Sequence, residues 1–331
     1  MLVSNGGAVR LVLNSGETLF LDATFRCRSG IAGVSHGHSD HLRKHSTQTI
    51  ATNQTALLFP SYFNNPGLEY GQQLKIGDAL VSLHDAGHVL GSAQFRIEED
   101  DNVVVYTGDM KASPSFLFGG AEQPECDTLV IDSTFGSPEY SFPPASDVAE
   151  SIKSWVSTHS DSNVVFGAYP LGKTQELVSI LNGIGVQPII SRRASHFSHV
   201  CDWSGLRQEF LESGTPEAEL SRAHACVEIV SPSLLQRSAA ITRSENGKRT
   251  LTALATGWAG SPLASGCDRA FPLSGHSDFS ELLEYAASSG AKRVLTVHGF
   301  DRELAAHLRK RGINARPLHL AGGAQARISD W

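Results

Sequence analysis

The 331-residue sequence lacks an excess of basic residues and long hydrophobic runs. Its formal net charge is −7, which argues against a basic coat that grips nucleic acid non-specifically but leaves room for a local basic groove. No stretch approaches the ~18 uninterrupted apolar residues of a membrane span. The N-terminus has no basic segment followed by a sustained apolar run, so we expect no secretory signal. These absences predict a soluble protein without a membrane partner.

Paired cysteines are also lacking. The five cysteines are scattered without any CxxC pair, at Cys27, Cys126, Cys201, Cys226 and Cys267. An odd, dispersed set predicts reduced thiols in a cytoplasmic protein and not a disulfide framework. A hydrophobic fraction of 40% and a charged fraction of 18% are ordinary for a globular chain. The length suits one large domain or two moderate ones.

The chain divides into two parts with different sequence patterns. Short apolar runs broken by Gly, Asn and Asp predict strands at 9–13, 18–22, 31–35, 79–84, 93–98, 103–107 and 128–132. From about residue 143, helical spacing alternates with strands. The helices are expected at 145–159, 174–181, 279–287 and 301–311, and the strands at 163–166, 188–190, 293–297 and 315–320. The pattern predicts an αβ core interrupted by an inserted α/β domain.

A dense cluster of metal-ligand residue types follows the apolar strand IAGV. It reads H-x-H-x-D-H, with His36, His38, Asp40 and His41, and leads into a segment of helix-like texture. Imidazoles and a carboxylate are the ligands that zinc prefers in a hydrolytic site. If the segment turns sharply, alternate side chains of the cluster could face one metal ion, and the next two side chains could face a second metal ion. A solvated polar loop is the weaker interpretation of so compact a pattern.

Further ligand candidates stand at predicted strand ends. His88 lies between two glycines in HDAGHVLG, Asp109 ends VVVYTGD, and His298 ends RVLTVH. Each alone is more typical of a structural residue. Together with the first cluster they complete two coordination spheres with room for a water, and the Asp109 carboxylate is placed to bridge two metals.

Six motifs carry a family resemblance: HGHSDH, GHVLGSAQF, YTGD, IDSTFG, LSGHSD and TVHGF. Their order resembles that of the β-CASP branch of the metallo-β-lactamase superfamily, over roughly residues 30–300. The branch includes RNase J, the endonuclease of pre-mRNA 3′-end processing, and Artemis. The resemblance implies an αββα sandwich formed by residues 1–137 and 272–331, with an inserted α/β β-CASP cap over 138–271.

The resemblance also implies a role for each site residue. One of two Zn²⁺ ions, with Mn²⁺ as an alternative, would be held by His36, His38 and His88. The other would be held by Asp40, His41 and His298, with Asp109 bridging them. His276 would be the general acid and Asp132 would orient it, so that Asp40, Asp132 and His276 form the catalytic set. Phe300 departs from the Glu that many RNA-cleaving members carry.

The cap would leave a groove for nucleic acid. Lys173, Arg192 and Arg193 are its candidate phosphate contacts, with solvated surface charge as the alternative for each.

A phosphate-binding loop is an independent rival interpretation. Residues 167–174, GAYPLGKT, match G-x-x-x-x-G-K-[ST] after a strand and before a helix. Pro170 removes a backbone donor from a loop whose function is to present N–H groups. The segment is therefore interpreted as cap structure, with Lys173 as a phosphate contact.

The leading hypothesis is a two-zinc nuclease of single-stranded nucleic acid. RNA is favoured, because His298 resembles the residue of RNA-directed members. A DNA exonuclease of the ligase-associated type is the alternative. A small-molecule thioester hydrolase of the same fold, a P-loop nucleotidase and a non-catalytic binding subunit are further alternatives. The partners expected besides nucleic acid are a second copy of the chain or repair and processing proteins.

Overall fold

The computed structural model describes residues 2–4, 7–63 and 65–320. The chain forms two compact units. Unit 1 contains Met1–Pro114, Phe118–Ser141 and His276–Trp331, and unit 2 contains Ser115–Leu117 and Phe142–Gly275. The predicted boundaries, after residues 137 and 271, each precede this division by four residues.

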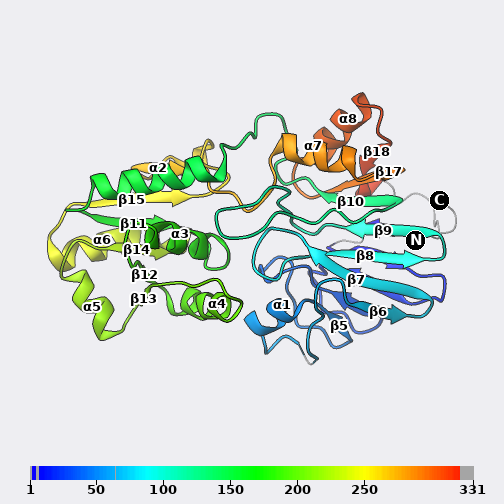
Figure 1. Cartoon of the computed structure of the whole chain (residues 1–331), viewed down its shortest axis with the longest axis horizontal. Helices are drawn as coiled ribbons and strands as arrows, with labels where there is room; N and C mark the ends of the chain where they lie inside the picture. Colours follow the sequence, from blue (N-terminus) through cyan, green and yellow to red (C-terminus); the bar gives the residue numbers. More distant parts are fainter. Residues whose placement is uncertain (1, 5–6, 64, 321–331) are drawn as a thin grey trace. The chain divides into compact units, whose positions relative to one another are not determined.

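Unit 1 is built on two β-sheets (Figure 1). The first has the order β1 (Leu2–Ser4), β2 (Val9–Val12), β3 (Thr18–Leu21), β4 (Ile31–Gly33) and β5 (Thr49–Ile50). The second has the order β18 (Ala315–Pro317), β17 (Arg293–Val297), β10 (Thr128–Asp132), β9 (Asn102–Tyr106), β8 (Ala93–Glu99), β7 (Ala79–Asp85) and β6 (Gln73–Ile76). Strands β6 to β9 pair antiparallel, whereas β9, β10, β17 and β18 pair parallel.

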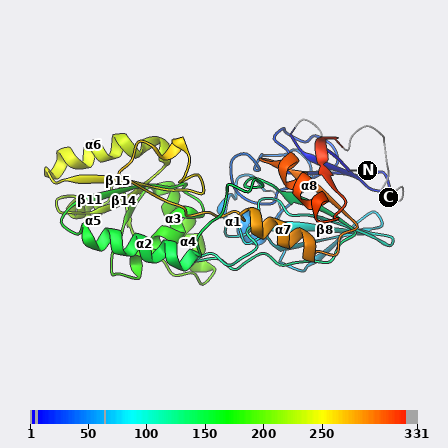
Figure 2. The ribbon, with the colours of Figure 1, turned by 90° about the horizontal axis from the view of Figure 1, so that it is seen from above.

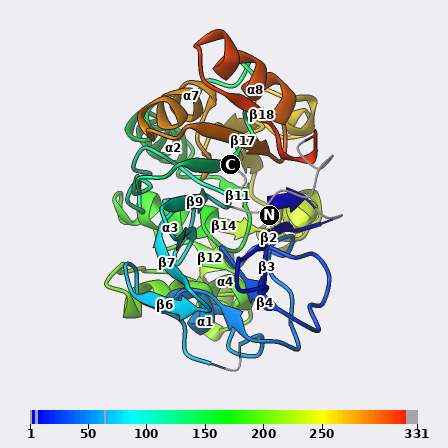
Figure 3. The same cartoon turned by 90° about the vertical axis from the view of Figure 1, so that its right-hand side faces the viewer.

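The period-two alternation of strand side chains gives the seven-stranded sheet two apolar faces. In β10, Val130 joins a core with residues of the five-stranded sheet, whereas Leu129 and Ile131 join a second core beneath the helices α7 (Phe279–Ser288) and α8 (Asp301–Lys310). Figure 3 shows these helices beside β17 and β18. Unit 1 also contains the short helix α1 (Asn53–Leu58).

Unit 2 contains one six-stranded sheet in which every described pairing is parallel. Its order is β13 (Leu211–Glu212), β12 (Ile189–Ile190), β14 (Val227–Val230), β11 (Asn163–Gly167), β15 (Thr250–Ala255) and β16 (Arg269–Phe271). The helices are α2 (Ala145–Thr158), α3 (Lys173–Asn182), α4 (Arg192–Trp203), α5 (Pro216–Arg222) and α6 (Leu235–Asn246).

Helices cover both faces of this sheet. Phe166 of β11 packs in a core with α2, α3 and α4, whereas its neighbour Val165 packs against Leu235 and Ala239 of α6. Figure 2 shows α6 and α2 on opposite sides of the strands. A parallel sheet buried on both faces needs continuous apolar strands, and NVVFG meets that need.

Most predicted elements are confirmed to within one or two residues at their ends. The predicted last strand over 315–320 is partly wrong: the strand ends at Pro317, and a 3₁₀ turn over Leu318–Leu320 follows. None of the helices in the described residues has the length and apolar character needed to cross a membrane.

Candidate metal centre

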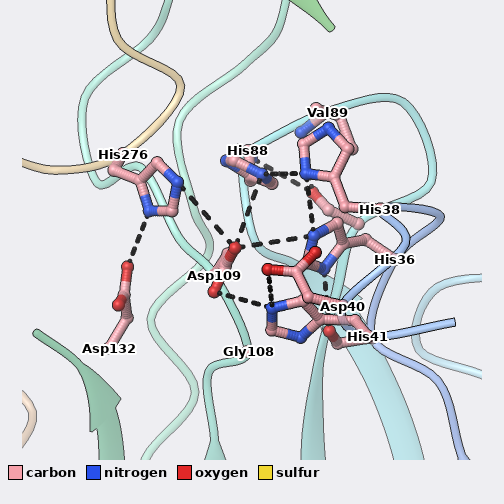
Figure 4. Close-up of polar contacts among 12 residues, drawn as sticks. His36, His38, Asp40, His41, His88, Val89, Gly108, Asp109, Asp132 and His276 are labelled. Carbon is pink, nitrogen blue, oxygen red and sulfur yellow. Dashed lines mark hydrogen bonds and ion pairs between the residues drawn. The ribbon is translucent and has the colours of Figure 1, made fainter. Parts of the chain in front are cut away.

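The HGHSDH motif leaves β4 in a tight turn. The carbonyl of His38 accepts hydrogen bonds from the backbone N–H groups of His41 and Leu42, at 3.1 and 2.9 Å. The helix-like texture expected after the motif is therefore wrong, since the segment forms a turn and no helix. The turn directs His36, His38 and His41 toward the same point (Figure 4).

Asp109 lies at the centre of these side chains. Its Oδ2 atom is 3.5 Å from Nε2 of His36 and 3.8 Å from Nε2 of His88, while its Oδ1 atom is 3.4 Å from Nε2 of His41. The two carboxylate oxygens thus face two different sets of imidazoles (Figure 4). Gly108 allows this approach, because at its φ of 56° a Cβ atom would lie 2.6 Å from Cβ of Ser35.

The spacing of the donor atoms suits a metal ion. Nδ1 of His38 lies 3.1 Å from Nε2 of both His36 and His88, and these atoms form a group with the Asp109 carboxylate. Ligand atoms around a tetrahedral zinc at 2.0–2.1 Å are roughly 3.3 Å apart. Imidazole nitrogens and one carboxylate are also the donors that zinc prefers. The residues therefore fit a bound metal.

The hydrogen bonds that His36 and His41 make through Nδ1 determine their tautomers. The Ser35 hydroxyl donates to Oδ2 of Asp22 at 2.6 Å, so it can only accept from Nδ1 of His36, at 2.9 Å. Nδ1 of His41 donates to the same Asp22 oxygen at 2.9 Å. In its neutral form each ring would consequently direct an Nε2 lone pair at the centre, the form in which histidine binds metals.

Asp22 is a site residue that the sequence reasoning missed. Its carboxylate is buried and accepts from the Ser35 N–H and hydroxyl, from His41 and from the Tyr106 hydroxyl. Its φ of 51° is rare for a residue other than glycine. The available signal was an acidic residue at the end of the apolar run TLFLD, the context that singled out Asp109.

Asp40 and His298 lie on a more open side of the centre. The Asp40 side chain is 75% exposed, and its Oδ2 atom is 3.7 Å from Nε2 of His41. The ring centre of His298 is 5.6 Å from the ring centre of His41. His298 has a φ of 64°, a strained value that recurs at functional sites, and Gly299 follows with a φ of 40°. Ser133 supports this turn by donating to the His298 carbonyl at 3.0 Å.

His276 approaches Asp109 from a third direction. Its Nε2 atom is 3.8 Å from Oδ2 of Asp109, and its Nδ1 atom is 2.9 Å from Oδ2 of the buried Asp132 (Figure 4). The other oxygen of Asp132 accepts from the Thr134 N–H and hydroxyl, at 2.9 and 2.7 Å. Asp132 thereby fixes the orientation of the His276 ring and leaves Nε2 facing the centre.

Burial and mutual charge set the pKa values in the centre. Burial, then the charge of His41, lowers the pKa of His36 well below its usual value. Burial disfavours the charged form of His41, but Asp109 and then Asp22 outweigh it and raise its pKa to about 10. Burial likewise opposes ionisation of Asp132, yet the His276 hydrogen bond lowers its pKa. Without metal, a protonated His41 thus lies between two carboxylates, and a metal cation would take the place of that proton.

Asp85, at the end of β7 before the loop that contains His88, is expected to make the stability of the folded protein depend on pH. Burial is the main cause that raises its pKa from 3.8 to about 6, against a hydrogen bond from the Gly87 N–H at 2.8 Å. The folded state therefore binds more protons than the unfolded state between these values, and stability falls as pH rises through that window. We expect Asp85→Asn to stabilise the protein by on the order of 1–2 kcal/mol at pH 8, because the amide still accepts from Gly87.

Thermal unfolding at pH 8 and pH 4.5 measures this effect, with Glu125→Gln, an exposed position in unit 1, as the matched control. The gain should shrink at pH 4.5. An unchanged or lower melting temperature of Asp85→Asn at pH 8 would contradict the expectation.

The three predicted phosphate contacts lie in unit 2, outside this cluster. Lys173 begins α3, and Arg192 and Arg193 begin α4. Nζ of Lys173 is 5.4 Å from the centre of the Tyr169 ring, and Arg192 lies 3.8 Å from the Glu212 carboxylate.

In the P-loop-like segment, the groups that would hold a nucleotide already donate hydrogen bonds within the protein. It does connect a strand, β11, to a helix, α3. However, the Gly172 N–H donates to the Gln175 side chain at 2.7 Å, and the buried Thr174 hydroxyl donates to the Tyr169 carbonyl at 2.8 Å. Since a bound nucleotide would need the amide for its phosphate and the hydroxyl for its Mg²⁺, the geometry argues against nucleotide binding there.

Solved structures share this architecture. A crystal structure of a protein of unknown function from Enterococcus faecalis matches with a TM-score of 0.65, covering 93% of each chain at 12% identity. At that identity the match concerns the fold alone. Two sheets with flanking helices and an inserted α/β unit confirm the predicted fold class.

Comparisons of sequence agree with the site. Residues 269–316 match the family described as a Zn-dependent metallo-hydrolase RNA specificity domain. The chain is 34% identical over 307 residues to a protein of Opitutus terrae named "Probable DNA ligase", a match that covers 89% of this chain and 29% of the relative. It is 31% identical over 170 residues to the "5' exonuclease Apollo" of Gallus gallus, covering 48% of this chain and 37% of the relative.

Fold, site and relatives together place the chain beside metal-dependent hydrolases of the metallo-β-lactamase type, to which it is similar. Within that class, the chain is similar to nucleases of the β-CASP type, the resemblance that its motifs indicated. It spans only about a third of the length of these two relatives.

Proposed function

We propose that the chain is a nuclease that hydrolyses phosphodiester bonds of single-stranded nucleic acid with two Zn²⁺ ions, or Mn²⁺ in their place. The observation that carries the proposal is the placement of Asp109. One of its oxygens faces His36 and His88, and the other faces His41. A carboxylate shared between two ligand sets is what a bridged pair of ions requires.

Each predicted ligand keeps its role in this proposal. His36, His38 and His88 would hold one ion, and Asp40, His41 and His298 the other. When bound, such ions make water nucleophilic near neutral pH and stabilise charge on the reacting oxygens. The protein fixes the ligands beforehand, since Ser35 and Asp22 hold the His36 and His41 rings in the required tautomers.

His276 would supply the proton for the leaving oxygen. Its Nδ1 proton is held by Asp132, so Nε2 is the atom that can donate toward the centre. The Asp132 carboxylate also stabilises the imidazolium form that donates. This division of roles resembles other hydrolases in which a buried acid orients a catalytic histidine.

DNA is the substrate that the breadth of the matches favours. The relative named as a DNA ligase matches 89% of the chain, whereas the RNA specificity domain matches residues 269–316 alone. RNA, which the sequence favoured, is kept as the second candidate on the description of that domain. The exonuclease name of a second relative supports attack from an end.

Digestion of labelled single-stranded DNA and RNA tests the proposal. Oligonucleotides labelled at the 5′ or 3′ end are incubated with Zn²⁺- or Mn²⁺-loaded protein, and Asp40→Ala serves as the inactive reference. We expect cleavage of DNA, lost with Asp40→Ala; the order of products gives the polarity. Folded, metal-loaded protein that cleaves neither polymer would refute the nuclease proposal, and turnover of a thioester instead would support the small-molecule alternative.

We also propose that unit 1 is the metallo-β-lactamase domain and unit 2 the β-CASP cap, and that the protein acts in the cytoplasm. Five free cysteines support a reducing compartment. The ligase name of one relative supports a repair protein as a partner.

A further inference from the structure

Helix α4 of unit 2 has a buried face and an exposed face that differ in chemistry. Ala194, Phe197, Val200 and Cys201 are buried against the unit. The side chains on the opposite face are exposed and follow one another at intervals of four, three and four residues. They are Arg192, His196, His199 and Trp203, here called the α4 stripe. Such spacing aligns them along one side of a helix about 16 Å long.

Trp203 is the most unusual member of the stripe. Its side chain is 74% exposed at the end of α4, although tryptophan is highly buried on average. An exposed indole offers a flat, rigid surface at low entropic cost, which is why tryptophan is enriched where proteins bind other molecules. The α4 stripe therefore ends in a surface on which a planar group can stack.

Exposed arginines lie near both ends of the α4 stripe, and each is paired with a carboxylate. Arg207, four residues beyond Trp203, lies 3.6 Å from Glu209, and Arg192, at the opposite end of α4, lies 3.8 Å from Glu212. Exposed ion pairs of this kind contribute about 0–1 kcal/mol, so a phosphate can replace the carboxylate partner. Arg193 adds a third guanidinium beside the stripe, 5.8 Å from the Phe197 ring centre.

We propose that the α4 stripe is a docking surface for single-stranded nucleic acid. A base stacks on Trp203, Arg207 contacts a phosphate next to it, and Arg192 and Arg193 contact phosphates further along the strand, at the other end of α4. Proteins that bind single strands without base selection combine aromatic side chains, on which bases stack, with cationic groups that contact the backbone. The inference rests on the proposed function for the choice of nucleic acid over an acidic protein, but binding is measured separately from cleavage.

Equilibrium binding of labelled dT20 and rU20 tests the inference. The full chain is used with Asp40→Ala to prevent cleavage, and Trp203→Ala is added to it. Because stacking of one base contributes several-fold in affinity, we expect about a 5- to 100-fold rise in Kd, with partial recovery in Trp203→Phe. Arg192→Ala and Arg207→Ala should each lower the slope of log K against log salt by about 1.

Leu220→Ala is the matched control, since Leu220 on α5 of the same unit is 69% exposed and apolar. Its Kd should not change. An unchanged Kd in Trp203→Ala, or an equal loss in Leu220→Ala, overturns the inference. A protein that binds through Trp203 but cleaves nothing keeps the docking surface and overturns the nuclease proposal. If Trp203→Ala cleaves normally with an unchanged KM, the nuclease proposal stands and the docking surface is overturned.

Discussion

Replacement of Asp109 by asparagine is expected to abolish hydrolysis, with a loss of at least about 1,000-fold in kcat/KM. The substitution preserves the shape of the side chain but removes the charge that faces His36, His88 and His41. An amide is a poorer metal ligand and cannot bridge two cations as a carboxylate does. Metal content, measured by mass spectrometry after dialysis, should fall together with activity.

Asp101→Asn is the matched control for this experiment, because Asp101 is an exposed acid in a turn of the same unit. It should retain full activity and metal content. If Asp109→Asn kept both its metal and its activity, Asp109 would not be the residue on which the centre depends. A variant that lost activity but kept two ions per chain would instead limit the role of Asp109 to positioning.

His276→Gln is expected to lower kcat by about 100- to 10,000-fold, the usual contribution of a positioned general acid. Metal content should stay unchanged, because His276 reaches only one oxygen of Asp109, at 3.8 Å, and the proposed ligand set does not include it.

The leaving group separates a proton donor from a merely structural residue. A nitrophenyl phosphodiester has a leaving oxygen that needs no proton, so its hydrolysis should be much less affected by His276→Gln than DNA cleavage is. His224→Gln, at an exposed position of unit 2, is the control. Equal losses with both substrates, or loss of metal in His276→Gln, would contradict the assignment of a general acid.

Strands and helices with regular apolar spacing were predictable, and those around the centre were predicted closely. The strand over Thr128–Asp132 coincides with its prediction, as does Arg293–Val297. The part of unit 2 from residue 191 to residue 270 was left without predicted elements. Its helix α4 has polar residues such as Ser195 and Ser198 on the buried face, which weakens the apolar periodicity that a sequence can reveal.

The P-loop pattern shows why a motif needs its context. Residues 167–174 satisfy the pattern and join a strand to a helix, yet the Gln175 side chain and the Tyr169 carbonyl accept from the groups that would bind a phosphate and its Mg²⁺. A linear pattern specifies residue types but does not state which partner each donor has. That information depends on side-chain packing around the loop.

The sequence by itself determined the ligand types, because the HGHSDH cluster and the strand-end residues His88, Asp109 and His298 have a chemistry that metals select. Only the tertiary structure decided how they meet. The positive φ values of Asp22 and His298 are accompanied by contacts with segments far away in the chain, since Asp22 accepts from the Tyr106 hydroxyl and the His298 carbonyl accepts from the Ser133 hydroxyl. Local preference opposes such conformations, so only the surrounding packing can impose them.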